Sequence, residues 1–262
     1  MPVAAFLPTM TAPEAGRDTP PLAPIGILGG MGPLATLDFM HKVLAATPAR
    51  CDQDHLPLLV SSIPQIPDRT AAFLGEGASP LPALVDSARR LADAGARLLV
   101  MPCNTAHLWF EPLQVALGLP MLHLVDAALD EAVRQAPPGA ALGLLATPAT
   151  LASGLYVRRA GAAVRWQMPT PDELARWVMP GIQAIKAGDL AQGETCLRQA
   201  ARALADRGAR ILVLGCTEIP LVLDAACAGL PVIDATAALA RATVAWALAQ
   251  RAGTPGRQKA PA

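Results

Sequence analysis

The sequence predicts an α/β fold of two pseudo-symmetric domains, each a parallel sheet flanked by helices, with an active site between them. Short apolar runs alternate with longer segments of helical periodicity, which is the pattern of strand–helix–strand units with right-handed crossovers. A 16-residue segment also occurs twice, at residues 88–103 and 201–216, with eleven identical positions. The spacing of 113 residues between the copies is too long for a solenoid repeat and fits the length of a domain half.

Eight apolar runs are the expected strands. Several of them are apolar at consecutive positions, which is typical of parallel strands buried on both faces. The expected strands are residues 25–28, 56–61, 97–101, 120–122, 141–145, 164–167, 211–214 and 232–233.

Two of the intervening segments have a clear helical period. Residues 80–94 carry an apolar stripe and are followed by Gly95, a suitable residue just past a helix end. Residues 190–206 repeat this arrangement before Gly208. We therefore expect a helix before the repeated strand in each half.

The repeat places a domain boundary near the middle of the chain. We expect a first α/β domain at residues 24–123, completed by a strand and helix at 231–250, and a second at 124–230. The ends, residues 1–23 and 251–262, are rich in Pro, Gly and polar residues and are predicted to be disordered tails.

Composition narrows the class of protein. The 262 residues are 53% hydrophobic and 16% charged with zero net charge, which favours a folded core and gives no electrostatic footprint for nucleic acid or an anionic membrane. The sequence contains no uncharged apolar window of about 18 residues, and residues 1–23 do not resemble a secretory signal. Five cysteines are no disulfide framework. We expect a cytoplasmic protein with reduced thiols.

Cys103 and Cys216 end the two copies of the repeat and are the main candidates for chemistry. Each follows a predicted strand and precedes a polar segment. Ligands of open α/β sheets sit beyond the carboxyl ends of the strands, so two facing domains would place both sulfurs beside one ligand. Helix-end amides are expected to stabilise the thiolates and to bind a substrate carboxylate. The alternative is buried packing, which is common for free cysteine.

The other three cysteines lack this sequence context, and a metal site is an alternative role for Cys103. Cys51, Cys196 and Cys227 lack such a context and are expected to be structural or incidental. Cys103 and His107 lie four residues apart and could form half of a zinc site, which requires three or four ligands.

A glycine loop follows the first predicted strand. Gly30, Gly32 and Ala35 fit a dinucleotide-binding fingerprint, but Pro33 removes an amide that phosphate would need. The alternative is that the loop lets the backbone approach a small ligand closely.

Two cations are candidates for binding a carboxylate. Arg69 follows a stiff loop with two prolines and is suited to bidentate carboxylate binding; a surface salt bridge is the alternative. Lys186 lies at a predicted helix end before Gly188, where many lysines only interact with the helix dipole.

Together these motifs resemble the aspartate/glutamate racemase superfamily, and most closely its aspartate racemases. The likeness runs from about residue 24 to 248. It rests on the segments at residues 25–33, 64–70, 101–107 and 214–218. The resemblance implies two α/β domains with one catalytic cysteine each, no pyridoxal phosphate, no metal and a homodimer.

The resemblance also implies the site residues. Cys103 and Cys216 map onto the catalytic pair, and Arg69 and Lys186 onto the groups that recognise the side-chain carboxylate. The other expected substrate contacts are Met31, Gly32, Asn104, Thr105, Ala106, Thr147, Thr217 and Glu218.

The predicted activity is cofactor-independent interconversion of L- and D-aspartate by proton transfer at the α-carbon between two cysteines. Ser61, Ser62 and Ile63 stand where asparagines are expected, so a broader range of amino acids stays open. Other open alternatives are a decarboxylase or cis–trans isomerase of the same superfamily, a nicotinamide-dependent oxidoreductase, and a ligand-binding protein without turnover.

Overall fold

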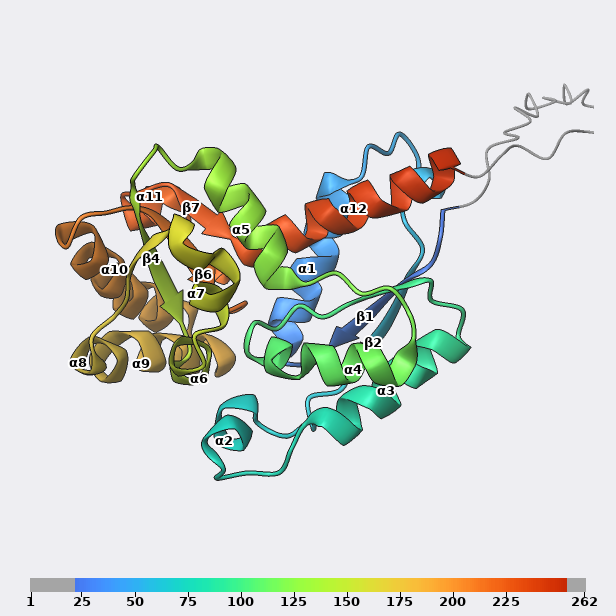
Figure 1. Cartoon of the computed structure of the whole chain (residues 1–262), viewed down its shortest axis with the longest axis horizontal. Coiled ribbons are helices and arrows are strands. Elements are labelled where there is room, and N and C mark those ends of the chain that lie inside the picture. Colours follow the sequence, from blue (N-terminus) through green and yellow to red (C-terminus); the bar gives the residue numbers. More distant parts are fainter. Residues whose placement is uncertain (1–21, 254–262) are drawn as a thin grey trace, which may run out of the picture.

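Two lobes, each built on a parallel sheet, make up the structure (Figure 1), a computed structural model that describes residues 22–253. The first sheet has the order β2-β1-β3 and the second β5-β4-β6-β7. The strands are β1 (Ile25–Gly29), β2 (Leu58–Ser62), β3 (Leu98–Val100), β4 (Ala141–Ala146), β5 (Arg165–Gln167), β6 (Ala209–Gly215) and β7 (Val232–Asp234). Every pairing between them is parallel, which confirms the predicted fold class.

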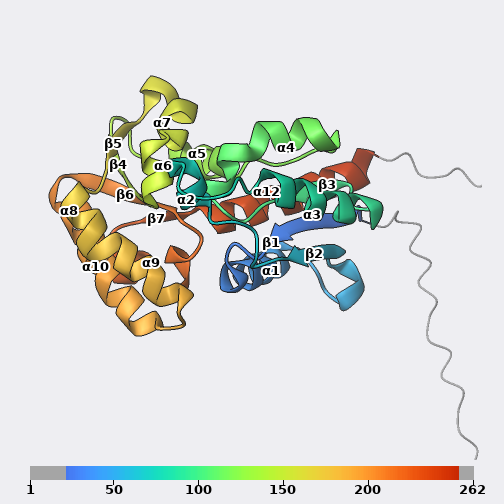
Figure 2. The same ribbon diagram turned by 90° about the horizontal axis from the view of Figure 1, so that it is seen from below.

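The helices of the first lobe are α1 (Pro33–Ala46), α2 (Arg69–Leu74), α3 (Leu81–Asp93) and α4 (Phe110–Leu117), with 3₁₀ turns η1 (Asp52–Asp54) and η2 (Thr105–Trp109). Figure 2 shows α1 and α3 on opposite sides of the sheet, whereas α2 lies against η2 and the second lobe. The predicted end of α3 is confirmed, because Gly95 has φ +99° and Ala96 N–H donates to the Leu91 carbonyl at 3.0 Å.

The second lobe has more and shorter helices. They are α6 (Pro148–Ala152), α7 (Leu155–Ala160), α8 (Pro171–Glu173), α9 (Met179–Lys186), α10 (Leu190–Asp206) and α11 (Ala225–Ala228). The turns η3 (Gly161–Ala163) and η5 (Ile219–Leu221) are 3₁₀, and η4 (Leu174–Val178) is a π-turn. The Asp189 carboxylate caps α10 by accepting Gln192 N–H at 3.0 Å.

The sequence repeat produces the same packing in both lobes. The central strand β1 carries Gly26, where a Cβ would lie 2.5 Å from Leu99 Cδ2, with Ala96 and Leu91 also close. In β4, a Cβ on Gly143 would lie 2.5 Å from Leu212 Cδ2, with Ala209 and Leu204 alongside. These three neighbours are equivalent positions of the two repeats. The repeat therefore preserves a close contact between helix, strand and central glycine.

The last strand corrects one expectation. We expected residues 231–250 to complete the first domain, yet β7 pairs with β6 in the second sheet. The corresponding edge of β3 is already occupied, since Met121 forms a parallel bridge with Leu99. The register is equivalent in the two lobes: Leu99 N–H donates to the Pro120 carbonyl and Leu212 N–H to the Pro231 carbonyl.

Two long helices join the lobes. The helix α12 (Ala235–Gly253) leaves β7 in the second lobe and packs against α1 of the first lobe and against α5 (Leu124–Gln135). The helix α5 in turn packs against β6, β7 and α7 (Figure 1). Each half of the chain thus ends in a helix that contacts the other lobe, so the two sheets are held side by side.

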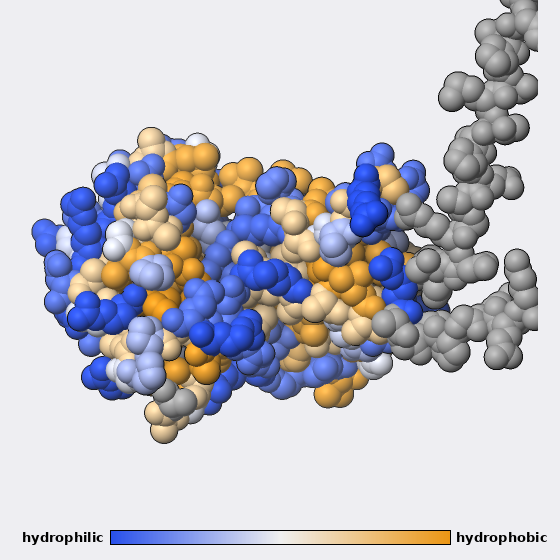
Figure 3. Space-filling view, turned by 90° about the horizontal axis from the view of Figure 1, so that it is seen from above, coloured by the Kyte–Doolittle hydropathy of each residue, from blue (hydrophilic) through white to orange (hydrophobic). Residues whose placement is uncertain are grey.

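The described part of the chain extends slightly beyond the expected domain ends. Leu22, assigned to the first tail, is buried in the core, and α12 continues to Gly253. The rest of the predicted tails, residues 1–21 and 254–262, lies outside the described residues. None of the helices that the structure describes combines the length and apolar character needed to cross a membrane. Apolar side chains on the face seen in Figure 3 form several separate groups among polar ones.

Candidate active site

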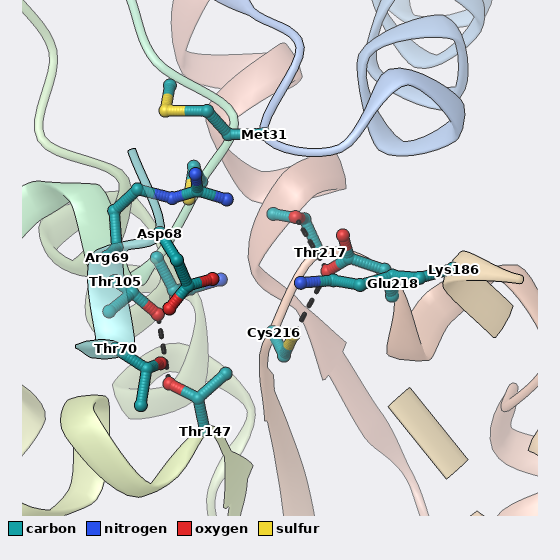
Figure 4. Close-up of a pocket in the computed structure, with 12 residues that line it drawn as sticks. Met31, Asp68, Arg69, Thr70, Thr105, Thr147, Lys186, Cys216, Thr217 and Glu218 are labelled. Carbon is teal, nitrogen blue, oxygen red and sulfur yellow. Dashed lines mark hydrogen bonds between the residues drawn. The ribbon is translucent and has the colours of Figure 1, made fainter. Parts of the chain in front are cut away.

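A cavity between the lobes brings together nearly all of the predicted site residues (Figure 4). It is lined by Met31, Asp68, Arg69, Thr70, Cys103, Asn104, Thr105, Thr147, Lys186, Cys216, Thr217 and Glu218. Gly32 and Ala106 were expected there but do not line it, whereas the sequence motifs gave no role to Asp68 and Thr70, which do. The cavity lies beyond the carboxyl ends of β3 and β6, where such sheets bind ligands.

Cys103 reaches the cavity from the first lobe. Its side chain is buried, and burial raises the pKa of the thiol. The positive charge of Arg69 acts against this rise, and the negative charge of Glu218 adds to it. The backbone N–H of Ala106 bonds to the sulfur and also favours the thiolate. Ala106 therefore acts on the site through its amide and not as part of the cavity wall.

Cys216 reaches the cavity from the second lobe, directly after β6. Its thiol donates a hydrogen bond to Glu218 Oε2 at 3.1 Å. Burial raises the pKa of this thiol well above its ordinary value, and the adjacent Glu218 charge raises it further. The two thiols thus differ in the charge that acts on them most directly. Cys216 is hydrogen-bonded to the Glu218 carboxyl group, which favours the thiol, whereas the positive charge of Arg69 favours the thiolate of Cys103.

The pKa values of both thiols are raised and not lowered as expected, although one backbone amide favours the thiolate at each sulfur, Ala106 N–H at Cys103 and Glu218 N–H at Cys216. Cys216 precedes only the short 3₁₀ turn η5, which aligns few peptide dipoles, whereas η2 after Cys103 runs directly into α4. The desolvation of a buried thiolate is the larger effect for both sulfurs.

Tyr156 is a residue that the sequence analysis missed. It belongs to α7 of the second lobe, is fully buried, and donates its hydroxyl proton to Asn104 Oδ1 at 2.5 Å. Asn104 lines the cavity from the first lobe, and its Nδ2 is buried without a hydrogen-bond partner in the structure. Because Tyr156 occupies the amide oxygen, the two Nδ2 protons are the donors left for a ligand.

Three threonine hydroxyls join the lobes beside the cavity. Thr105 Oγ1 lies 2.9 Å from Thr147 Oγ1 and 3.1 Å from Thr150 Oγ1. Thr147 also caps α6 by accepting Thr150 N–H at 3.3 Å. On this side the lobes are connected by buried hydrogen bonds, which fixes the relative position of the cavity walls.

Arg69 and Lys186 bring two positive charges to the site from different lobes. Arg69 begins α2, and one of its terminal nitrogens donates to the carbonyls of Ile66 and Pro67 at 3.0 Å each. Lys186 ends α9. Among the residues that the structure describes, neither side chain forms an ion pair with a carboxylate. This pair is therefore free to bind an anionic group in the cavity.

Comparison with known proteins identifies this arrangement. A model of the Asp/Glu/hydantoin racemase family matches residues 28–243. The chain belongs to this family. The resemblance deduced from the motifs is thereby confirmed, and the protein is an isomerase of the racemase type.

Two relatives and one solved structure show how similar other proteins are to this racemase. The broad specificity amino-acid racemase RacX of Bacillus subtilis is 31% identical over 231 residues, 86% of this chain and 98% of the relative. A glutamate racemase of Deinococcus radiodurans is 30% identical and covers 84% of this chain and 73% of its own length. The solved aspartate racemase of Picrophilus torridus gives a TM-score of 0.74 at 29% identity, over 85% of this chain and 94% of that one.

In this racemase, His107 has a structural environment. Its Nε2 accepts the Leu124 N–H at 3.0 Å, so Nδ1 carries the proton and donates to the Cys103 carbonyl at 2.8 Å. Burial lowers the pKa of His107 to about 4. Both ring nitrogens are engaged, which leaves none for a metal. Within residues 22–253, no three His, Cys, Asp or Glu side chains are grouped to hold a metal ion.

The glycine loop is also explained by packing. Gly30 has φ +90°, and a Cβ there would lie 2.3 Å from the Ile63 backbone nitrogen. Gly32 precedes Pro33, the first residue of α1, at the entrance to the site. Close approach of the loop after β2 thus accounts for Gly30 without a phosphate.

Proposed function

We propose that this racemase interconverts L- and D-aspartate without a cofactor, by proton transfer between Cys103, Cys216 and the substrate α-carbon. The observation that carries the proposal is that two buried thiols, one from each lobe, line a single cavity. Racemisation requires a base on one face of the α-carbon and an acid on the other. Two thiols of opposite protonation state meet that requirement without further groups.

The pKa values of both thiols are raised, but the different surroundings of the cysteines make Cys103 the one that more readily becomes a thiolate. The Cys216 thiol already donates its proton toward Glu218, whereas Arg69 favours the thiolate of Cys103. Cys103 as thiolate would remove the α-proton and become a thiol. Cys216 would deliver its own proton to the opposite face and become a thiolate. The reverse reaction exchanges these roles, and the total number of protons is conserved.

The other cavity residues support an acidic amino acid as substrate. Asn104 Nδ2 and the hydroxyl-bearing residues Thr105 and Thr217 would bind the α-carboxylate and stabilise charge that develops on it. Arg69 and Lys186 would bind the distal carboxylate.

A broader range of amino acids is the second candidate. It is favoured by the 31% identity to a relative named as a broad specificity amino-acid racemase. A homodimer, a cytoplasmic location and the absence of nucleic-acid and membrane partners stay predictions from the sequence. Light scattering at micromolar concentration tests the dimer.

Chiral chromatography of aspartate incubated with the purified protein, without added cofactor, tests the proposed function. We expect both enantiomers to approach equal amounts, and in D₂O we expect deuterium at the α-position of the product, because thiol protons exchange with water. The rate is expected to increase from neutral to alkaline pH, since both thiol pKa values are raised. Product that retains its original α-proton would argue against the mechanism.

Tyr156→Phe is expected to raise KM for acidic and uncharged amino acids alike, by roughly five- to tenfold, the value of about one hydrogen bond. Without the tyrosine hydroxyl, the Asn104 amide loses the partner that orients it toward the α-carboxylate. Steady-state kinetics with aspartate and alanine measure the effect. A change in kcat or thermal stability with KM unaltered would indicate a purely structural tyrosine.

A further inference from the structure

A second cavity adjoins the catalytic one and shares three residues with it. The cavity around the cysteines encloses about 20 Å³ and the outer one about 200 Å³. The residues common to both are Arg69, Lys186 and Glu218. A volume near 20 Å³ holds little more than one water molecule, so the side chain of an amino acid bound at the cysteines has to extend toward the larger cavity.

The shared residues lie where the two cavities adjoin. Figure 4 shows Arg69 and Lys186 entering from opposite sides, with Glu218 beside Lys186. Glu218 is buried, and its Oε1 has no hydrogen-bond partner in the structure. A Cβ on Gly32 would lie 3.2 Å from this oxygen. The absence of a side chain at Gly32 therefore leaves space beside Glu218 in the outer cavity.

The walls of the outer cavity indicate what it can hold. Beyond the shared charges it is lined by glycine backbone and apolar side chains, namely Gly30, Gly32, Pro33, Leu34, Pro64 and Ile185. These walls favour an apolar group through burial. At the inner end two basic side chains, Arg69 and Lys186, stand against the one carboxyl group of Glu218, so this end does not favour a further positive charge.

We infer that the outer cavity is a side-chain subsite that admits uncharged aliphatic amino acids longer than aspartate, such as leucine and methionine. The inference rests on the proposed racemase function. Consider a substrate whose α-carbon lies between Cys103 and Cys216. If its side chain points to Arg69 and Lys186, the outer cavity lies beyond the end of that side chain. Aspartate ends at the cations, whereas a longer chain continues between them.

Leu34→Trp tests the subsite, with Leu37→Trp as the matched control. Both residues are exposed on α1, but only Leu34 lines the outer cavity. The indole of Leu34→Trp is expected to fill that cavity and to lower the ratio of kcat/KM for methionine to that for aspartate by about tenfold or more. Leu37→Trp is expected to leave the ratio as in the wild type. Leu34→Phe supplies a second, smaller obstruction if the tryptophan variant does not fold.

The outcomes separate this inference from the proposed function. An unchanged ratio, with both substrates slowed equally, would mean that the outer cavity is only an entrance. A wild-type protein that racemises aspartate but neither methionine nor leucine would overturn the subsite and leave the proposed function in place. A wild-type protein that racemises no amino acid would overturn the proposed function itself.

Discussion

Cys103→Ser and Cys216→Ser are each expected to lower the rate of racemisation by roughly 10²- to 10⁴-fold. A serine hydroxyl is a far weaker acid than a thiol, so each variant leaves one face of the α-carbon without a working proton donor or acceptor. Chiral chromatography in the absence of cofactor measures the loss. Thermal stability is expected to change little, because the substitution is nearly isosteric.

The remaining thiol gives this prediction a second readout. In Cys216→Ser, Cys103 can still remove and return a proton on its own face, so one enantiomer is expected to exchange its α-proton with D₂O without inversion. Cys103→Ser is expected to show the same exchange with the other enantiomer. Cys196→Ser is the control, since Cys196 is a buried cysteine inside α10, away from the cavity. Near-normal racemisation by either active-site variant would rule out the two-thiol mechanism.

The fold could be predicted from the sequence because the residues that the repeat preserves are those that pack against the central strand of each lobe. Leu99 and Leu212 hold the same position against a glycine of the central strand in each lobe, and such a close contact leaves little freedom for substitution. The partner of β7 could not be predicted in this way. Periodicity identifies a strand, but the choice of sheet depends on which edge is already occupied, here by Met121.

The sequence indicated those cavity-lining residues that follow a strand end, but not the contacts that form where the lobes meet. Cys103 and Cys216 are marked by their place after the repeat. No motif identifies Tyr156, because it acts on the site through a hydrogen bond to Asn104, 52 positions away in the sequence. The thiol pKa shifts were predicted with the wrong sign, since burial by the opposite lobe is invisible in the sequence around each cysteine.

Arg69→Ala is expected to lower kcat/KM for aspartate by about 2–3 kcal/mol in transition-state binding, roughly 30- to 150-fold, the value of a hydrogen bond to a charged group. Alanine and methionine have no distal carboxylate, so their kcat/KM values are expected to fall much less. The physical basis is that Arg69 faces the cavity without a carboxylate partner among the described residues. Steady-state kinetics on the three amino acids measure the difference.

A structural role for Arg69 makes a different prediction, because its side chain also bonds the Ile66 and Pro67 carbonyls. Loss of those bonds would loosen the loop before α2 and lower thermal stability and all activities together. Arg90→Ala is the control, since Arg90 is an exposed arginine that pairs with Asp86 on α3. An equal fall for aspartate and alanine would show that Arg69 does not recognise the acidic side chain, and Lys186 alone would then have to bind it.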